Sequence, residues 1–285
     1  MTIACPAKIN LTLEVLNRRE DGYHALRSVM VPLALADELT IEPSDTFTFR
    51  CSDASLENDA NLVVRAARAL NPNPKVAIAL TKRIPSQAGL GGGSSDAAGV
   101  LRTALAGAVT PILGHDWVAI ARALGSDVPF FLVESGALVE GTGERVTATG
   151  VLPDWHVLIV KPPVAVSTAA AYAMLDARPR PSRARNESVS IQMLTALQRC
   201  DFLAVEQLLS NDFHDVIAES SAEVRASVDA LRFAGANNAL LAGSGSAVFT
   251  LAPDAATIAS ISARLILDDR YARFVTSFAR GSTWR

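Results

Sequence analysis

The feature that most constrains this chain is a glycine-rich segment between a strand-like run and a helix-like run. Four of the five residues from 89 to 93 are glycine, namely Gly89, Gly91, Gly92 and Gly93. Because they have no side chains, their backbone N–H groups can approach an anion closely. Residues 94–96 (SSD) are good N-cap residues, and the helix that they open offers its positive end and its unpaired N–H groups. The segment therefore predicts a phosphate-binding loop.

Two common nucleotide loops do not fit this segment. A Walker A loop requires a lysine, and residues 84–105 contain none. A dinucleotide fingerprint GxGxxG starting at Gly89 places Ser94 where the last glycine is required. A turn without a ligand is the remaining alternative, but tight turns seldom use three adjacent glycines followed by two serines. We interpret the loop as a phosphate site of another class.

Strand-like and helix-like segments alternate along the chain without a regular βαβ repeat, which predicts an α+β protein of two lobes. Period-two alternation over residues 8–15 indicates a half-buried strand. Residues 178–185 (RPRPSRAR) are expected to form an exposed loop. Further strands are expected at 28–50, 76–80, 156–163, 239–251 and 273–278, and helices at 61–70, 96–105, 117–124, 190–198, 202–209, 221–233 and 254–266.

Composition limits the classes of function. The chain has 285 residues, 49% of them hydrophobic, and a net charge of −3, so we expect a soluble protein that does not bind nucleic acid. No apolar run reaches the roughly 18 residues that a membrane span needs, and the N-terminus lacks the apolar stretch of a signal peptide. Cys5, Cys51 and Cys200 are too few and too far apart for a disulfide framework or a zinc cluster. We expect a cytoplasmic protein, monomeric or weakly dimeric, with no membrane partner.

The glycine loop also carries a resemblance to a known family. The segment PSQAGLGGGSSDAA (85–98) resembles the ATP-binding motif of the GHMP kinases, which include galactokinase, homoserine kinase and mevalonate kinase. PAKINLTLEV (6–15) is similar to the first motif of that family, and LLAGSGSAVF (240–249) to its third. The resemblance implies an ATP-binding N-terminal lobe (1–152) with a left-handed βαβ crossover and a ferredoxin-like C-terminal lobe (153–285), with the active site between them.

The resemblance also implies the ligands of the loop. ATP is expected as the phosphoryl donor, together with Mg²⁺. We assign no protein ligand to the Mg²⁺ ion. His115, His156 and His214 lie in no metal-binding spacing. The third motif, including residues 243–245, is expected to support the loop. The residues expected to bind ATP are Pro85, Ser86, Gln87, Ala88, Gly89, Leu90, Gly91, Gly92, Gly93, Ser94 and Ser95.

Two further segments resemble one branch of the family. Residues 8–24 (KINLTLEVLNRREDGYH) and 125–132 (GSDVPFFL) are similar to the branch that phosphorylates a hydroxyl of a cytidine-diphosphate-linked acceptor on the non-mevalonate route to isoprenoid precursors. A kinase for homoserine or mevalonate is the main alternative, and the RREDGYH turn argues against it. A catalytically silent nucleotide-binding homologue is another, but it is expected to lack Lys8 or Asp127, and both are present.

Lys8 and Asp127 are the candidate catalytic residues. Phosphoryl transfer requires a group that orients and deprotonates the hydroxyl and a cation that offsets developing charge. Asp127 matches the catalytic aspartate of the family motif, although the local sequence alone fits a turn cap equally well. Lys8 is a charge inside an otherwise apolar strand, where a buried ammonium needs an anionic partner.

Four residues are candidates for acceptor binding. Asn10 shares a strand face with Lys8 because side chains alternate along a strand. Tyr23 offers a ring for stacking and His24 offers donor and acceptor nitrogens, and the family binds cytidine at this turn. Tyr172 is a second stacking platform, although helix packing explains it equally well.

Overall fold

The computed structural model describes residues 1–20, 22–107, 116–178 and 188–279. Three sequence-based predictions fall partly or wholly outside these ranges. Apart from Arg178, the expected loop at 178–185 lies outside the described residues, as do His115 and Asp21 of the DGYH turn.

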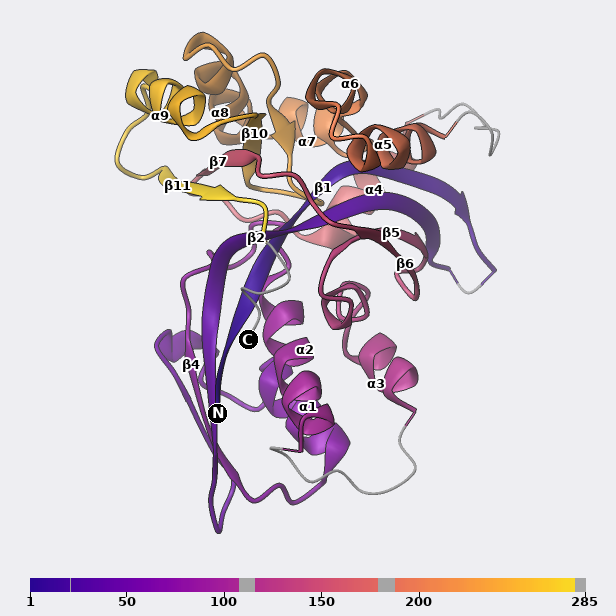
Figure 1. Cartoon of the computed structure of the whole chain (residues 1–285), viewed down its shortest axis with the longest axis vertical. Helices are drawn as coiled ribbons and strands as arrows, with labels where there is room; N and C mark the ends of the chain where they lie inside the picture. Colours follow the sequence, from indigo (N-terminus) through magenta and orange to yellow (C-terminus); the bar gives the residue numbers. More distant parts are fainter. Residues whose placement is uncertain (21, 108–115, 179–187, 280–285) are drawn as a thin grey trace.

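The first half of the chain builds most of a seven-stranded sheet (Figure 1). Its main path runs β3-β4-β2-β1-β8, and β5 pairs with both β2 and β6. The strands are β1 (Thr2–Arg18), β2 (His24–Pro43), β3 (Thr48–Cys51), β4 (Val76–Thr81), β5 (Gly136–Gly141), β6 (Arg145–Gly150) and β8 (Ser210–Asn211). The helical elements are η1 (Ala54–Leu56), α1 (Leu62–Leu70), α2 (Gly92–Leu105), α3 (Trp117–Leu124) and η2 (Phe130–Leu132).

The second half builds a four-stranded antiparallel sheet with the order β11-β7-β10-β9. Its strands are β7 (His156–Lys161), β9 (Leu240–Leu241), β10 (Val248–Ala252) and β11 (Ala272–Ser277). The helices are α4 (Thr168–Asp176), α5 (Val189–Gln198), α6 (Phe202–Leu208), α7 (His214–Ser220), α8 (Ala222–Phe233) and α9 (Ala255–Arg264). With helices between β7 and β9 and α9 between β10 and β11, this is a ferredoxin-like order of elements. The predicted α+β class is confirmed.

The two sheets are held together by shared packing. β8, from the second half of the chain, pairs in parallel with β1 through Thr12 and Ser210. One core cluster contains Ile9 of β1 together with Ile159 of β7 and Phe249 of β10, all of them fully buried. A second cluster fills the space between the first sheet and helices α1 and α2. Side chains from both lobes therefore fix the region where β1 crosses between them (Figure 1).

The prediction that β1 is half-buried was wrong. Asn10, Thr12 and Glu14 on its polar face are as buried as the apolar face, at 1% exposure or less. Burial is tolerated because each of these polar groups has a hydrogen-bond partner. Asn10 donates to Ser28 and the Thr12 hydroxyl pairs with that of Ser190. The Glu14 carboxylate accepts bonds from the Ser188 hydroxyl and the Ser190 N–H.

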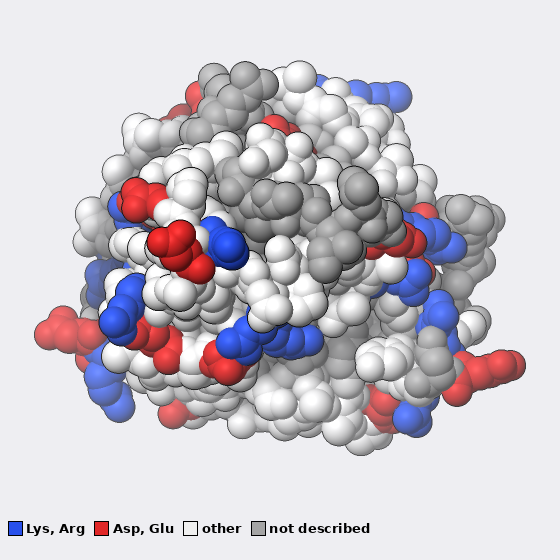
Figure 2. All heavy atoms as spheres, turned by 90° about the horizontal axis from the view of Figure 1, so that it is seen from below, with Lys and Arg blue, Asp and Glu red and all other residues white. Residues whose placement is uncertain are grey.

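Several boundaries also differ from the sequence-based ones. The expected strand at 28–50 is divided into β2 and β3, and the expected strand at 239–251 is interrupted by the glycine turn between β9 and β10. α4, α7 and the β5–β6 hairpin were not predicted. Among the helices of the described residues, none is long and apolar enough to cross a membrane. On the face shown in Figure 2, acidic and basic side chains of the described residues are interspersed.

Candidate active site

The glycine loop leads directly into α2, which begins earlier than predicted. Gly91 is the N-cap, with φ of 71°, and no side chain caps the helix. Ser94 and Ser95 therefore lie within the first turn and Asp96 follows it, and none of the three is the N-cap that the sequence had suggested. A left-handed backbone at Gly91 favours glycine and turns the chain sharply into the helix. The first N–H groups of α2 are left without a side-chain acceptor, which suits them to an anion.

Backbone contacts join the loop to the third glycine motif (240–249) and to the first motif (6–15), which contains Lys8. Gly89, with φ of +76°, lies so close to the third motif that a Cβ atom there would overlap the carbonyl oxygen of Ala242. The N–H of Ala247 donates to the carbonyl of Ala88 over 3.1 Å, and the N–H of Lys8 donates to that of Leu90 over 2.9 Å. Segments that are far apart in sequence thus meet at one loop.

A cavity of about 380 Å³ lies on one side of the loop. Its walls come from η1, the start of α1, the end of β4 and the loop itself, so it combines apolar surface with unpaired backbone donors. Its lining residues are Leu56, Ala60, Asn61, Leu62, Lys82, Asp96 and every residue from 84 to 94.

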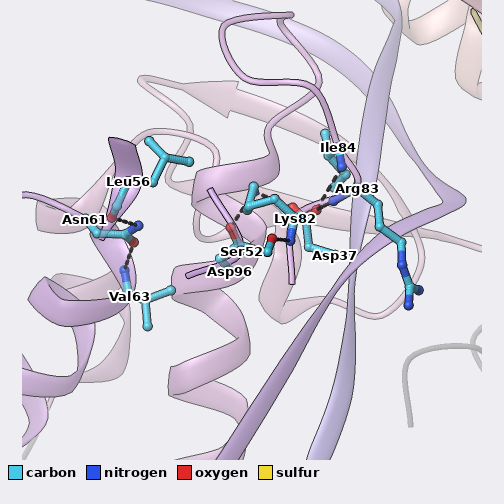
Figure 3. Close-up of polar contacts among 9 residues, drawn as sticks. All are labelled: Asp37, Ser52, Leu56, Asn61, Val63, Lys82, Arg83, Ile84 and Asp96. Atoms are coloured by element: carbon cyan, nitrogen blue, oxygen red, sulfur yellow. Dashed lines mark hydrogen bonds and ion pairs between the residues drawn. The ribbon is translucent and has the colours of Figure 1, made fainter. Parts of the chain in front are cut away.

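Lys82 lies between two buried carboxylates at the back of this cavity (Figure 3). Its ammonium contacts Asp37 and lies 2.7 Å from Oδ2 of Asp96. Burial lowers the pKa of Lys82, but the charges of Asp96 and Asp37 outweigh it and hold that pKa above its ordinary value. Burial also raises the pKa of Asp96, against the opposing effect of Lys82. Oδ1 of Asp96 has no hydrogen-bond partner among the residues that the structure describes. Sequence reasoning missed this cluster because its members come from β2, α2 and the residue after β4.

A second cavity, of about 250 Å³, lies on the other side of the loop and shares Gly89, Gly91 and Ser94 with the first. A phosphate on the loop would therefore be accessible from both cavities. The side chains that line it come from both lobes: Lys8, Asn10, Leu13, Leu26, Ser28, Met30, Ser126, Asp127, Thr168, Tyr172, Phe213 and Ser244, together with Gly243. The Thr168 and Ser244 hydroxyls lie 3.0 Å apart here. Ser244 belongs to the third motif, which was expected to support the loop, whereas Thr168 was not predicted as a site residue.

The structure brings Lys8, Asn10 and Asp127 together in this second cavity. The Lys8 ammonium lies 3.5 Å from Oδ2 of Asp127, and it donates to Oδ1 of Asn10 over 2.8 Å. The Lys8 side chain is 3% exposed and that of Asp127 is 32% exposed. A buried cation beside a carboxylate that remains accessible is an arrangement that can accept a proton from a hydroxyl and stabilise the charge that develops.

Tyr172, which lines the same cavity, forms a stacked pair with His24. Their ring centroids are 4.9 Å apart with an interplanar angle of 13°, and Nε2 of His24 lies 2.9 Å from Oδ1 of Asp176. Tyr172 also packs edge-on against Phe213. Flat aromatic surface with polar ring atoms is what a nucleobase requires.

Tyr23 does not join this pair. Its side chain is 69% exposed and lines a separate cavity of about 570 Å³. That cavity is bounded by α3 and the β5–β6 turn and is also lined by Arg19, Arg122 and Glu144. The structure therefore separates two neighbouring residues that the sequence had grouped as one base-binding pair.

No cluster of three or more His, Cys, Asp or Glu side chains that could hold a metal ion occurs within the described ranges. His214 is half-buried and its Nδ1 accepts the N–H of Leu241, and burial lowers its pKa. In the first turn of α2, the buried hydroxyl oxygen of Ser95 has no hydrogen-bond partner within the described part of the chain.

Comparison with known families finds two matching domains. Residues 61–135 match the N-terminal domain of the GHMP kinases, and residues 193–267 match the C-terminal domain of the same kinases. The first match includes the glycine loop and Asp127, and the second includes the third glycine motif.

Relatives with named activities match over most of the chain. The 4-diphosphocytidyl-2-C-methyl-D-erythritol kinase of Deinococcus radiodurans is 42% identical, over 91% of this chain and 87% of its own length. The enzyme of the same name from Symbiobacterium thermophilum is 39% identical, over 89% and 91%.

Solved structures agree in fold. A crystal structure of 4-(cytidine 5'-diphospho)-2C-methyl-D-erythritol kinase superimposes with a TM-score of 0.78 at 34% identity, covering 98% of this chain and all of the other. The homoserine kinase of Cytophaga hutchinsonii gives a TM-score of 0.67 at 19% identity, covering 97% and 94%, a likeness of fold alone.

Proposed function

The chain belongs to the GHMP kinase family, and from this premise we propose that it transfers the γ-phosphoryl group of ATP to the 2-hydroxyl of 4-diphosphocytidyl-2-C-methyl-D-erythritol. This phosphotransfer to an alcohol belongs to the methylerythritol phosphate route to isoprenoid precursors. The observation that carries the proposal is the position of the Lys8–Asp127 pair, in a cavity lined by both the glycine loop and Tyr172, on which His24 stacks.

The proposed ATP site is the glycine loop, residues 85–95. Its uncapped helix start and its positive-φ glycines support this role, since they leave backbone donors free for phosphate oxygens. The cavity of about 380 Å³ beside the loop offers room for the nucleoside. Gly89, Gly91 and Ser94 also line the second cavity, which directs the γ-phosphate toward Asp127.

Asp127 is the proposed base and Lys8 the proposed electrostatic partner. The carboxylate takes the proton of the acceptor hydroxyl while the oxygen of that hydroxyl bonds to the γ-phosphorus of ATP. The bond from that phosphorus to the bridging oxygen of ADP breaks, and ADP leaves with the electron pair. The Lys8 ammonium, 3.5 Å from Asp127, orients that carboxylate and offsets charge on the transferred group, which is most of what phosphoryl transfer requires of a protein.

The acceptor site is proposed from Asn10, Tyr23, His24 and Tyr172. The stacked rings of His24 and Tyr172 support cytosine binding next to the catalytic pair. Asn10, which contacts Lys8, is positioned for the hydroxyl-bearing end of the acceptor. Tyr23 contributes from the neighbouring cavity, where its exposed ring is available to a bound base.

The proposal includes Mg²⁺. The oxygen donors at the loop suit it, because Mg²⁺ usually keeps several waters and binds substrate phosphates with one or two protein ligands. Ser94, which lines both cavities, carries the side-chain oxygen that would hold it. When bound, the ion would neutralise charge on the phosphates.

The proposal extends to the lobe boundary, the location and the oligomeric state. A lobe boundary between residues 152 and 153 is supported by the two sheets, since it falls in the connection from β6 to β7. Action in the cytoplasm is supported by three cysteines that all remain free thiols. We propose a monomer or weak homodimer that binds its two small substrates and neither nucleic acid nor membrane.

A coupled assay for ADP tests the function. With ATP and Mg²⁺, turnover is expected with 4-diphosphocytidyl-2-C-methyl-D-erythritol and not with homoserine or mevalonate. The product is expected to carry the new phosphate on the 2-oxygen, which phosphorus NMR detects. Turnover with homoserine or mevalonate alone would assign the chain to another branch, and ATP binding without turnover of any acceptor would identify a silent homologue.

A further inference from the structure

We propose that Ser28 is a positioning residue that orients Asn10 and thereby aims the Lys8 ammonium at Asp127. The inference rests on the proposed function for its kinetic consequence, but its geometry is independent of the acceptor. Ser28 lies on β2, is fully buried, and was not singled out by any sequence motif.

The argument begins with the single proton of the Ser28 hydroxyl. Oγ of Ser28 donates to the backbone carbonyl of Thr12 over 2.6 Å. A carbonyl can only accept, so the proton of Ser28 is committed to it. Toward Asn10, the hydroxyl can then act only as an acceptor, and Nδ2 of Asn10 donates to it over 2.8 Å.

The orientation of the Asn10 amide follows from this commitment. Since Nδ2 must face Ser28, Oδ1 faces the other way and accepts from the Lys8 ammonium over 2.8 Å. A flipped Asn10 amide would present its N–H groups to the Lys8 ammonium. Neither the amide N–H groups nor the ammonium would then have an acceptor in this contact. Because Lys8 and Asn10 are almost fully buried, water is poorly placed to compensate for such a loss.

The position of the Lys8 ammonium therefore depends on two contacts, one to Oδ1 of Asn10 and one to Oδ2 of Asp127 at 3.5 Å. If the first contact is released, the flexible lysine stem can take other rotamers, and the cation no longer has a fixed place beside the base. Catalysis is sensitive to such displacements, because the transition state requires the charge in one position.

Thr12 offers a matched control on the neighbouring strand. Its hydroxyl is also fully buried, but it accepts from the N–H of Val29 over 3.0 Å and pairs with the Ser190 hydroxyl over 2.8 Å. Neither contact reaches Asn10. Ser28 bonds to the carbonyl of Thr12 and not to its side chain, so Thr12→Val preserves the acceptor of Ser28. The two hydroxyls resemble each other in burial and differ in connection to the catalytic pair.

The test compares Ser28→Ala with Thr12→Val in the full chain. We expect kcat to fall about tenfold in Ser28→Ala with both KM values within about twofold of wild type, the scale of one hydrogen bond next to a charge. Thr12→Val is expected to keep kcat within about twofold of wild type. The two variants are expected to lose similar amounts of thermal stability, since each loses one buried hydroxyl.

Nuclear magnetic resonance of the Asn10 side-chain amide gives a second readout that needs no acceptor. Its N–H signals are expected to shift and exchange faster with solvent in Ser28→Ala, and to remain unchanged in Thr12→Val. Equal losses of kcat in the two variants, or an unchanged Asn10 signal in Ser28→Ala, would overturn the proposal. If the wild-type protein fails to turn over the cytidyl acceptor, the proposed function fails, while the Asn10 signal still decides the role of Ser28.

Discussion

The ammonium of Lys8 on β1 lies 3.5 Å from the carboxylate of Asp127, 119 positions later in the chain, in the turn between α3 and η2. Lys8 is buried and Asp127 is partly accessible, so the pair presents one reactive carboxylate oxygen to the cavity while its cation stays out of water. This relationship motivates the first prediction.

Lys8 and Asp127 are expected to act as one unit. Asp127→Asn is predicted to lower kcat by about 10²- to 10⁴-fold, the usual value of general-base assistance, with much smaller changes in KM. Lys8→Met is also predicted to lower kcat far more than it raises KM. The double variant is expected to be scarcely slower than the worse single variant, because partners in one network are not additive. Steady-state kinetics of the four proteins measure this. Losses that multiply in the double variant would mean that the two residues act independently.

Gly91→Ala is expected to weaken ATP binding at least about tenfold while the protein remains folded. A Cβ atom there would lie 3.0 Å from Cγ of Lys8 and from the ring of Phe131, and φ is +71°. The alanine therefore strains the loop and displaces the lysine. Calorimetric titration with an ATP analogue gives the affinity.

Gly150→Ala is the control for backbone strain alone. Gly150 also has a positive φ, of +90°, but a Cβ atom there would meet nothing within 4 Å, and it lies in neither of the cavities that flank the loop. Both variants are expected to lose about 1 kcal/mol of stability from the left-handed backbone. Equal ATP affinities in the two variants would show that the phosphate site lies elsewhere.

The rings of His24, Tyr172 and Tyr23 are expected to contribute to acceptor binding. Alanine at any of them is predicted to raise the KM for the cytidyl acceptor roughly tenfold, since stacking on a base is worth about 1 to 3 kcal/mol. The KM for ATP is predicted to change little. Phe233→Ala removes an aromatic ring that is 83% exposed and lies in none of the three cavities described, so it serves as the control. A rise in both KM values together would indicate a structural role instead.

Asp96 is expected to make stability depend on pH. Burial raises its pKa from 3.8 to about 8, so over this range the folded state binds a proton that the unfolded state has released. The free energy of unfolding should therefore fall as pH rises from about 4 to about 8, because the unfolded state binds fewer protons there. Asp96→Asn cannot ionise and lacks this component, which is on the order of a few kcal/mol.

Urea titrations of wild type and Asp96→Asn between about pH 5 and pH 8 measure this difference. The asparagine variant is expected to gain stability relative to wild type as pH rises, since all other titrating groups are shared. A stability difference between the two proteins that stays constant over this range would show that Asp96 does not titrate there.

Much of the local structure was predictable because it depends on neighbours in the chain. The helix at 117–124 follows from its apolar spacing, and its N-cap Asp116 accepts from two N–H groups as such residues do. The prediction that residues 89–93 bind phosphate follows from missing side chains, a property of the residues themselves. The helix boundary at Gly91 was missed because a left-handed glycine cap leaves no side-chain signal.

The Lys8–Asp127 pair shows the limit of such reasoning. A lysine in an apolar strand indicates an anionic partner, and the sequence alone motivated the pairing with Asp127 through a family motif. The same reasoning grouped Tyr23 with His24, whereas in the structure Tyr23 lines a separate cavity and His24 stacks on Tyr172, because adjacent residues in an extended segment point to opposite sides.

By itself the sequence determined the class of fold, the order of its segments, and the loop that can hold phosphate, since each of these depends on short-range periodicity or on residue type. Only the tertiary structure decided that the polar face of β1 is buried, that Lys82 lies between Asp37 and Asp96, and that Ser28 orients Asn10. Those relationships depend on strand register and on which elements cover a sheet. Register and coverage are set by packing between residues far apart in the chain, which no local pattern encodes.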